Sequence, residues 1–480
     1  MQLSRIERLR ARLESVLAPE GPALDLAVLR ITVAVVLLLS TSIWAAPEWA
    51  ALPEAARTIP HGVGWLVPLL RIDPPTVELA LLVFRVACAL GAIGLVTRAS
   101  WLVIASTSSY LLLVPQLGGA VFHDHHLLWL AVIVAASPAG DALSLDAWIA
   151  RRRGRPRPAR GRAHGLAVRL AWLVIGCVFL FPGIHKLAES GLAWALSDNL
   201  RNQMWWKWAQ DPSLVPSFRL DRHPLLTRAL ALATIAFELC FLPLVLHPRT
   251  RALAVLAACA FHAGAELFMG IQFSVLWATY TMFVPWQSLL HRVRPPRAES
   301  HTSEQEADDP RRRAPSLPPS PPPPTRPLTP LVATALPLFT GILVAGATAD
   351  MQAYPFACYP TFQWMAGDTM PALEVTVIDG AGTEMVLDRA QFQEPGPRGW
   401  AMSWRLAGVY GDFDAHAFEA YWNDLASRSS VPELRDARRV RAERVQLSID
   451  PDASPTVRER APLLELERQP DGRFHATARP

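Results

Sequence analysis

Long apolar stretches, separated by shorter polar segments, occupy most of the chain up to residue 349. Each stretch carries few charges and has about the 20 residues that a helix needs to cross roughly 30 Å of hydrocarbon. The pattern predicts an all-α polytopic membrane helix bundle with about nine transmembrane helices. The apolar windows are residues 26–46, 76–96, 101–118, 122–137, 166–185, 225–246, 252–270, 273–289 and 331–349.

The pattern changes after residue 349, where shorter elements replace the long apolar windows. Residues 372–388 indicate two strands around a glycine-containing turn, and two more strands are predicted near 441–449 and 462–477. Helical spacing appears over 413–428, so the tail predicts a small α+β domain. The expected apolar face of this helix consists of Phe413, Ala417, Ala420, Tyr421 and Leu425.

A charged and then proline-rich segment connects the last two windows. It contains SLPPSPPPPTRP and favours an extended polyproline conformation. A plain spacer is the simpler interpretation, and a ligand for an SH3-type domain is the alternative. The expected parts of the chain are a cytoplasmic arm (1–25), a transmembrane domain (26–290), a cytoplasmic linker (291–330), a last transmembrane helix (331–349) and an extracytoplasmic α+β domain (350–480).

Composition agrees with a membrane protein, because 51% of the residues are hydrophobic and only 18% are charged. The arginines determine the expected orientation. With nine spans, the basic N-terminal arm, Arg98 and the segments 151–162, 247–251 and 291–313 all fall on one side, which the positive-inside rule makes cytoplasmic. The chain is then a multi-pass protein of the inner (plasma) membrane with its tail outside. Four of the five cysteines lie in apolar windows and do not indicate a disulfide framework.

Ionisable side chains inside the apolar windows are costly to bury and are therefore candidates for function. Arg30 and Arg85 lie in the first two windows, and Glu238 lies in the sixth. A structural ion pair among them and a catalytic role are both consistent with the sequence, which does not determine the pairing.

A second group of ionisable residues falls in the outer half of the predicted bundle. The sequence FHDHHLLWL places Asp124 and His125 at the start of the fourth window, where His123 and His126 would share a helix face. A metal site and an interfacial polar cap are the two interpretations. No second Cys or His cluster completes a four-ligand set, so no metal is predicted.

Two later windows add to this group. Lys186, in FLFPGIHKL beside His185, would either snorkel to the lipid headgroups or lose its proton in an apolar cavity. The preceding Gly183 allows a close helix approach or a local break. His262 and Glu266, in CAFHAGAELF, are one turn apart and are expected to face the bundle interior, as a structural pair or as part of a site.

With these residues in place, the chain resembles the horizontally transferred transmembrane (HTTM) domain family, which is similar to the membrane part of vitamin K-dependent γ-glutamyl carboxylase. The resemblance covers roughly residues 20–290. Its most specific parts are the lysine segment and the Phe-His that follows an arginine-containing turn. The matching segments are DLAVLRITVAVVLLL, FHDHHLLWLAVIVAASPAGDALSLDAW, FLFPGIHKLAESGLAWALSDNLR and FELCFLPLVLHPRTRALAVLAACAFHAGAELF.

The resemblance implies three catalytic residues. Lys186 matches the lysine of a G-x-K-K-L segment that acts as the base on reduced vitamin K, with His185 in place of the preceding lysine. His262 matches the family's Phe-His, and Asp124 with His125 is the nearest match to an Asn-His pair. The histidines would orient the quinone oxygens or stabilise developing charge. The further candidates for orienting the substrate or the quinone are Asp124, Glu266 and His185.

The implied co-substrates are a reduced quinone of the vitamin K type, O2 and CO2. Oxygen addition to the deprotonated quinol would create a strong base, which removes a proton from a weakly acidic carbon that CO2 then traps. Quinone-linked redox chemistry without carboxylation is an equal alternative, because residues 350–480 show no clear match to the propeptide-binding region of the carboxylase.

A second functional class is a non-enzymatic membrane scaffold or receptor whose outer domain binds a partner or an envelope component. A transporter is a third, which the absence of an obvious inverted repeat in the sequence disfavours. The expected partners are the lipid bilayer and an extracytoplasmic protein, either a substrate or a partner, and not nucleic acid.

Overall fold

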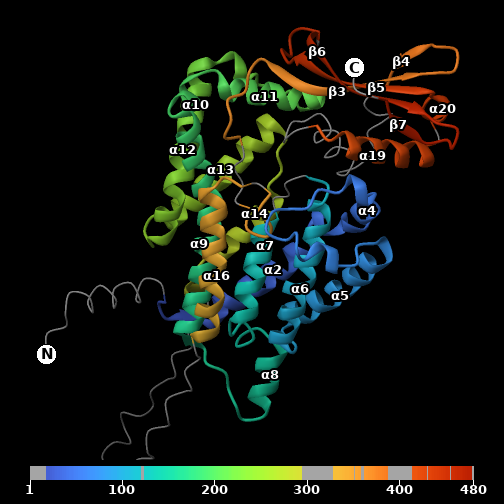
Figure 1. Cartoon of the computed structure of the whole chain (residues 1–480). Coiled ribbons are helices and arrows are strands. Elements are labelled where there is room, and N and C mark those ends of the chain that lie inside the picture. The colour runs from blue at the N-terminus through green and yellow to red at the C-terminus, as the bar shows by residue number, and fades with distance from the viewer. Residues whose placement is uncertain are drawn as a thin grey trace, which may run out of the picture.

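The computed structural model places an antiparallel sheet at one end of a tall helical region and helix α8 (Leu145–Arg152) at the other (Figure 1). Predictions for the arm before residue 18, for His123 and for the linker over 294–327 lie outside the described residues. The structure describes residues 18–119, 124–293, 328–350, 352–357, 362–387, 413–429, 431–454 and 456–477.

Helices form at eight of the nine predicted apolar windows. Among the described residues, five are long and apolar enough to cross a membrane by length and composition: α5 (Pro74–Ile93), α9 (Arg162–Ser190), α12 (Pro224–Leu246), α13 (Arg251–Met269) and α16 (Thr329–Ala347). Three more are shorter or less apolar: α2 (Ala23–Leu39), α6 (Thr97–Gln116) and α7 (His125–Ala136). The chain is therefore a multi-pass membrane protein with five candidate spans.

The predicted span over 273–289 is not a single helix, so this prediction was wrong. Val284 is extended (φ −79°, ψ 128°) and interrupts the helical backbone. It precedes Pro285, and a residue before proline is disfavoured in the helical region. The apolar run instead builds three short elements: α14 (Ser274–Thr279), the 3₁₀ helix η5 (Tyr280–Phe283) and α15 (Trp286–Val293).

The first predicted window is also interrupted, at Ser40. This residue is extended (ψ 115°) and ends α2. Its hydroxyl accepts a hydrogen bond from the backbone N–H of Ile43 and so caps the next helix, α3 (Thr41–Trp44). A serine after an apolar run thus turns the chain within the bundle and leaves a hydroxyl there.

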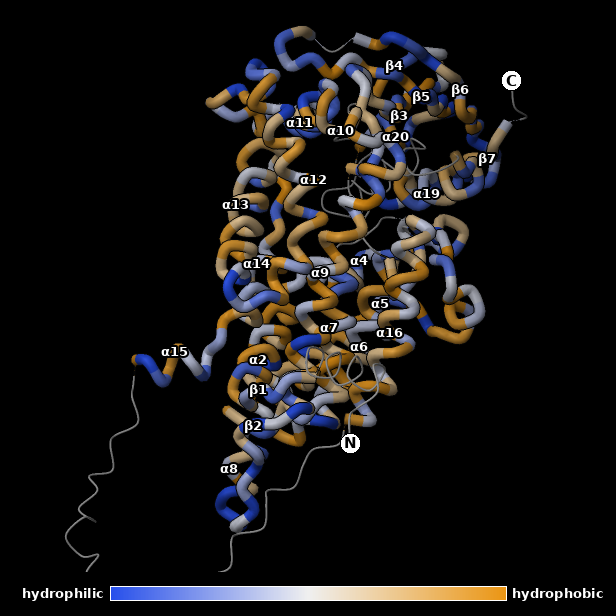
Figure 2. The backbone as a smooth tube through the Cα atoms, turned by 90° about the vertical axis from the view of Figure 1, so that its left-hand side faces the viewer, coloured by the Kyte–Doolittle hydropathy of each residue, from blue (hydrophilic) through white to orange (hydrophobic). Residues whose placement is uncertain are grey.

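Helix α9 is the centre of the helical region. It is the most buried of the five candidate spans and contacts α2, α7, α12 and α16. Helices α12 and α13 bury much less of their surface, and their outward side chains include the exposed leucines Leu232, Leu253, Leu256 and Leu267. Apolar surface of this extent is suited to contact with lipid. The hydropathy of the backbone in Figure 2 shows the same division, with hydrophobic residues along these helices.

The C-terminal tail forms the predicted α+β domain. Its strands make one antiparallel sheet in the order β4-β3-β5-β6-β7, and the predicted strands and helix are confirmed. The strands are β3 (Thr369–Ile378), β4 (Glu384–Val386), β5 (Arg439–Ser448), β6 (Val457–Arg468) and β7 (Phe474–Ala476). The helices are α19 (Ala415–Arg428) and α20 (Pro432–Asp436).

The buried face of α19 is shifted from the predicted one. Ala417, Tyr421 and Leu425 are buried as expected, but Phe418 and Trp422 are also buried. Phe413 and Ala420, by contrast, are only half-buried. The two additional aromatic rings have the larger apolar area, so they determine which side of the helix faces the sheet.

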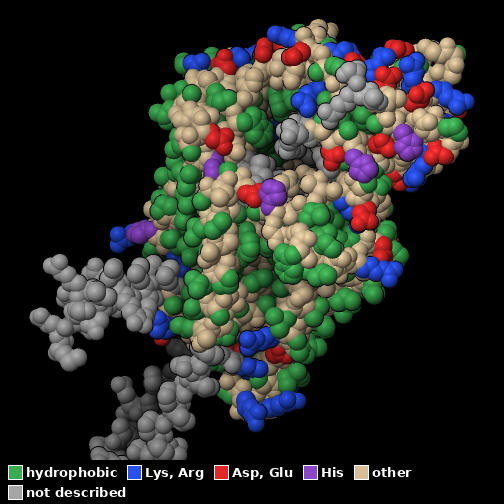
Figure 3. Space-filling model, in the orientation of Figure 1, with side chains coloured by type: hydrophobic (Ala, Val, Ile, Leu, Met, Phe, Trp, Pro, Cys, Tyr) green, Lys and Arg blue, Asp and Glu red, His purple; other side chains and the backbone are tan. Residues whose placement is uncertain are grey.

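The sheet domain packs on the loops at one end of the helical region. Helix α19 contacts the 3₁₀ helix η1 (Glu54–Ala56). Asp452, in the loop between β5 and β6, accepts hydrogen bonds from Arg219 (2.8 Å) and Arg222 (3.1 Å). On the face shown in Figure 3, charged side chains gather over the sheet domain and near α8, with mostly hydrophobic side chains between them.

Candidate functional site

A buried ion pair joins α9 and α12. The ammonium of Lys186 donates to both carboxylate oxygens of Glu238, with Nζ to Oε1 at 2.7 Å and Nζ to Oε2 at 2.9 Å. Lys186 is only 3% exposed and Glu238 only 4%. A charge pair so well shielded from water is costly to bury, so its presence inside apolar helices indicates more than packing.

Glycine at position 183 allows this pair to form. A Cβ added to Gly183 would lie 2.9 Å from the Cβ of Glu238, so any larger residue would push α12 away from α9. The predicted close helix approach is therefore confirmed. The local break is not observed, since α9 runs without interruption through Pro182 and Gly183 to Ser190. Lys186 follows Gly183 by about one helical turn, which brings its side chain to the same contact.

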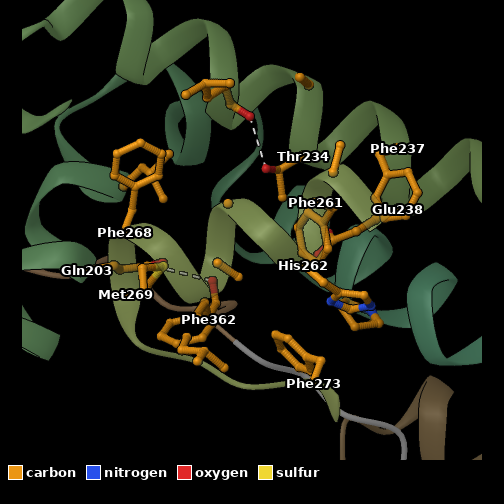
Figure 4. A pocket seen from close by; sticks show the side chains of 18 of the residues that line it. Gln203, Thr234, Phe237, Glu238, Phe261, His262, Phe268, Met269, Phe273 and Phe362 are labelled. Carbon is orange, nitrogen blue, oxygen red and sulfur yellow. Dashed lines mark hydrogen bonds between the residues drawn. The ribbon is translucent and has the colours of Figure 1, made fainter. Parts of the chain in front are cut away.

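Lys186 and Glu238 line a cavity of about 570 Å³ between α9, α12, α13 and the short helices near the sheet domain. Most of its lining is apolar, and several residues are aromatic (Figure 4). The polar side chains that line it are Lys186, Gln203, Thr234, Glu238 and His262. A concave apolar site with a few polar groups is typical of small-molecule binding.

His262 is a second polar side chain that lines the cavity. Its Nε2 lies 2.6 Å from the hydroxyl of Tyr280, and the two rings are stacked 5.8 Å apart. The side chain is only 1% exposed, and its Nδ1 has no hydrogen-bond partner among the described residues. A buried ring nitrogen in this state is costly unless something else binds to it. His262 lines the cavity, while its Nδ1 atom is itself shielded by the surrounding side chains.

A segment of the C-terminal tail closes the cavity on the side of the sheet domain. The indole N–H of Trp194, in α10 (Ala193–Leu196), donates to the carbonyl of Phe362 at 2.7 Å. Asn199, in α11 (Asn199–Gln210), accepts from the N–H of Ala366 at 2.7 Å. The Phe362 side chain lines the cavity. The tail therefore supplies part of the wall, which the sequence did not predict.

Both lysines of the chain lie near this cavity. The chain has 46 lysine and arginine residues. Only Lys186 and Lys207 are lysines, and all the others are arginines. The Lys207 ammonium lies 5.7 Å from the centre of the Phe362 ring, and burial lowers the pKa of this amine. Arginine is always protonated in proteins, whereas lysine can give up its proton. The rarity of lysine in the sequence was therefore a signal for these two positions, which the spacing of the residues did not give.

His185, although adjacent to Lys186, faces a different helix. Its Nε2 lies 2.6 Å from the carbonyl oxygen of Gly346 in α16, to which it donates. Consecutive helical residues point about 100° apart, so His185 and Lys186 cannot both face α12. His185 does not line the cavity.

Asp124 and His125 lie at the start of α7, outside the set of cavity-lining residues. Asp124 accepts a hydrogen bond of 2.6 Å from the hydroxyl of Ser40. His125 is buried, with its ring edge-to-face with Tyr354 at 5.2 Å. The structure thus brings Lys186 and His262 into one cavity but does not bring His125 there.

Glu266 is exposed on α13, whereas His262 is buried. The expectation that both face the bundle interior was wrong for Glu266. The buried stripe of this helix consists of Ala254, Ala258, His262 and Met269, and it is too narrow to include position 266. Four residues advance a helix by about 400°, so Glu266 is rotated by about 40° from His262, enough to leave such a stripe.

Arg30 and Arg85, of the first two windows, and Glu238, of the sixth, do not pair with one another. Arg30 donates to the carbonyls of Ala139 (2.7 Å) and Leu143 (2.6 Å). The Arg85 guanidinium lies 3.9 Å from the centre of the Trp44 ring. Only Glu238 contributes to the cavity. Among the described residues, no group of three or more His, Cys, Asp or Glu side chains is arranged to hold a metal ion.

A family model described as the HTTM domain matches residues 19–287, which is more than half of the chain. No curated protein and no solved structure matches the chain significantly. The matched range includes the ion pair, His262 and Tyr280, and it excludes Phe362. The cavity is therefore built from the matched region together with one segment beyond it.

Proposed function

Because the chain belongs to the HTTM domain family, we propose that it is a membrane enzyme that oxidises a reduced quinone in the cavity beside Lys186. The observation that carries this proposal is the Lys186–Glu238 pair, a buried ion pair that lines an otherwise mostly apolar cavity. The sequence resemblance leads to the same lysine. Coupling of the oxidation to proton abstraction from a carbon and addition of CO2 is the finer form of this proposal.

The shape and lining of the cavity support a quinone. Its volume of about 570 Å³ lies within the roughly 300–1,000 Å³ of small-molecule sites. Phe237, Phe261 and Phe273 line the cavity and provide aromatic contacts for a flat aromatic ligand (Figure 4). The polar groups come from three helices, with Lys186 on α9, Glu238 on α12 and His262 on α13, so a ring ligand in the cavity has more than one polar side chain to bind.

The ion pair can take up one proton as a unit. Lys186 passes one of its protons to the Glu238 carboxylate and accepts the hydroxyl proton of the ligand. The products are a neutral carboxylic acid and an ammonium beside the new oxyanion. This arrangement stabilises the negative charge where it forms and leaves no unpaired charge in the cavity.

His262 would hold the other oxygen of the ring. With Nε2 engaged by the Tyr280 hydroxyl, the Nδ1 atom either donates or accepts one hydrogen bond, depending on the tautomer. Tyr280 therefore fixes the orientation of the imidazole and sets the role of Nδ1.

A bound reduced quinone supplies two electrons and two protons, which O2 takes up to become hydrogen peroxide.

The distribution of charge supports an orientation for this chemistry. The arginine-rich segment 151–162 begins in α8, at the opposite end of the molecule from the sheet domain (Figure 1). By the positive-inside rule this end is cytoplasmic. The sheet domain is then extracytoplasmic, the cavity opens in the outer half of the bilayer, and an extracytoplasmic protein is the expected partner.

The test is quinol oxidation by purified protein in lipid nanodiscs, followed by quinone absorbance. We expect Lys186→Gln, which can still hydrogen bond to Glu238, to slow the reaction at least about 100-fold, since general bases contribute roughly 10²–10⁴-fold. Lys207→Gln is the matched control and keeps the wild-type rate. Wild-type protein that oxidises neither menaquinol nor phylloquinol would overturn the proposal and favour a scaffold or receptor.

A further inference from the structure

Helix α15 has one apolar side and one polar side. Successive residues of a helix are rotated by about 100°, so its apolar side chains fall together within an arc of about 100°. These side chains are Trp286, Leu289, Leu290 and Val293. The polar side chains occupy the rest of the circumference, and they are Gln287, Ser288, His291 and Arg292. A helix with this division can bury one side against an apolar surface while the other stays in water.

Most of the apolar side of α15 is exposed. Leu289 is 42% exposed, Leu290 48% and Val293 70%. Trp286 is half-buried, and its indole N–H donates to the carbonyl of Thr281 at 2.8 Å. Within the described part of the chain, the packing of α15 is mainly against α2. The three exposed side chains therefore form an apolar patch that is available to a partner.

The start of α15 lies at the level where several long helices begin. Asp25, in the first turn of α2, accepts a hydrogen bond from the backbone N–H of Gln287 at 3.1 Å. The same carboxylate interacts electrostatically with Arg160 and with Arg251, the first residue of α13. Arg160 lies in β2 (Arg160–Gly161), directly before α9. Since α9 and α13 are candidate membrane spans, α15 begins at the boundary of the hydrocarbon.

The direction of α15 differs from that of the long helices. Figure 2 shows it extending sideways from the helical region, towards the end that carries α8. The helix has 8 residues and is therefore about 12 Å long, too short to cross roughly 30 Å of hydrocarbon. The extended Val284 before Pro285 lets the chain turn in this direction. Helix α15 thus lies along the membrane surface.

We propose that α15 is an in-plane membrane anchor, which inserts its apolar side into the phospholipid leaflet at the arginine-rich end of the molecule. Leu289, Leu290 and Val293 lie among the acyl chains, and Trp286 lies at the interface, where tryptophan is enriched. Arg292, on the flank of the helix, binds the headgroup phosphates. This proposal goes beyond the proposed function, because no residue of α15 lines the cavity.

The anchor lies at the end of the family domain. The match to the HTTM domain ends at residue 287, so most of α15 lies beyond it. In the sequence, α15 is followed by the charged and proline-rich segment that leads to α16. The anchor therefore holds the end of the matched region at the membrane surface, before the chain continues into that segment.

Photo-crosslinking identifies what contacts the apolar side. The photoreactive residue p-benzoylphenylalanine replaces Leu290 in the full chain, in phosphatidylglycerol nanodiscs that hold a single copy of the protein. The matched control carries it at the exposed Ser288, on the polar side. We expect the peptide with position 290 to gain the mass of a phospholipid, and the control peptide to show little of this product. Cross-links from position 290 to another peptide of the chain, or to a second copy in discs that hold two, would overturn the anchor.

Amide hydrogen exchange of residues 290–293 in the same nanodiscs measures the strength of anchoring. Leu290→Gln should reduce their protection about tenfold or more, because glutamine loses the apolar burial but keeps a high helix propensity. Ser288→Gln introduces the same side chain on the polar side and should leave protection unchanged. Arg292→Gln should reduce it about fivefold, the contribution of one basic residue at an anionic membrane surface.

Exchange of the α9 amides is followed in parallel as the measure of an intact bundle. Equal effects of Leu290→Gln and Ser288→Gln, with α9 unchanged, would overturn the anchor. Wild-type protection of residues 290–293 in Leu290→Gln would do the same.

Discussion

Gly183 and Glu238 lie in direct contact across the α9–α12 packing, and that contact determines how closely the Lys186 ammonium approaches its carboxylate. A Cβ at position 183 would lie 2.9 Å from the Glu238 Cβ. The missing side chain on one helix therefore creates the place for the ion pair between the two. Packing and chemistry are specified by neighbouring residues of the same turn.

Gly183→Ala is expected to lower stability and activity together. The added methyl group forces α12 away from α9 and costs about 1–3 kcal/mol, the usual range for overpacking. The measurement is unfolding in mixed micelles, with quinol oxidation followed in parallel. Gly264→Ala is the control, because its Cβ has open space. Equal stability of the two variants would contradict the packing role of Gly183.

Replacing one residue of the ion pair is expected to lower the free energy of unfolding more than replacing both. Glu238→Leu leaves the Lys186 ammonium buried without its carboxylate and should cost about 3–5 kcal/mol. The double variant Lys186→Met, Glu238→Leu removes both charges and should recover most of that loss. A double-mutant cycle on the free energy of unfolding measures the coupling. Additive losses would show that the two side chains do not interact.

Tyr280→Phe tests the orientation of His262. It removes the hydroxyl that lies 2.6 Å from Nε2 while keeping the stacked ring. A lost hydrogen bond of about 1 kcal/mol should raise KM for quinol roughly fivefold. The change in kcat should be smaller, because Lys186 is untouched. Tyr354→Phe, whose hydroxyl bonds to the Ser109 carbonyl, is the control. An effect on kcat alone would argue against a positioning role.

The contact of the sheet domain with Arg219 is expected to depend on pH. Hydrogen bonds from Arg219, and then from Arg222, hold the pKa of Asp452 below its ordinary value of 3.8. A carboxylate with a lowered folded-state pKa contributes stability above its unfolded pKa, and loses it as the pH falls through the folded value. Hydrogen exchange of residues 449–454, corrected for intrinsic rates, should therefore rise below about pH 4.

Asp452→Asn is the control for this pH effect. It should show the faster exchange already at neutral pH, because its side chain carries no charge for the two arginines. Its exchange should then change little on acidification. Protection of the wild-type loop that is the same at pH 3 as at pH 7 would rule out the contribution of Asp452.

Much of the architecture could be predicted from the sequence, because hydropathy and arginine placement act along the chain. Eight apolar windows are helices, and the tail has the predicted strands. The window over 273–289 failed because a proline, Pro285, outweighed its apolar composition. Window length alone does not show where a chain must turn.

The site could be predicted only in part. Lys186 and His262 were identified and lie in one cavity. Glu238 was identified without its partner, since a pair between helices depends on their relative rotation, which hydropathy does not give. Glu266 was placed on the wrong face for the same reason. The position of Phe362 in the cavity wall could not be predicted, because a long linker separates it in the sequence from the helices that form the rest of the cavity.

Phe362 comes from the C-terminal tail, and this has a practical consequence for expressing the protein as two fragments. Expression of residues 1–293 alone would produce most of the ion-pair site with one wall missing, so loss of activity in such a fragment would not show that the sheet domain is catalytic. Supplying residues 328–480 as a separate chain is the informative complement. Helix α16 contacts α7 and α9, and Phe362 bonds to Trp194, so the second fragment carries its own attachment points for reassembly in the membrane.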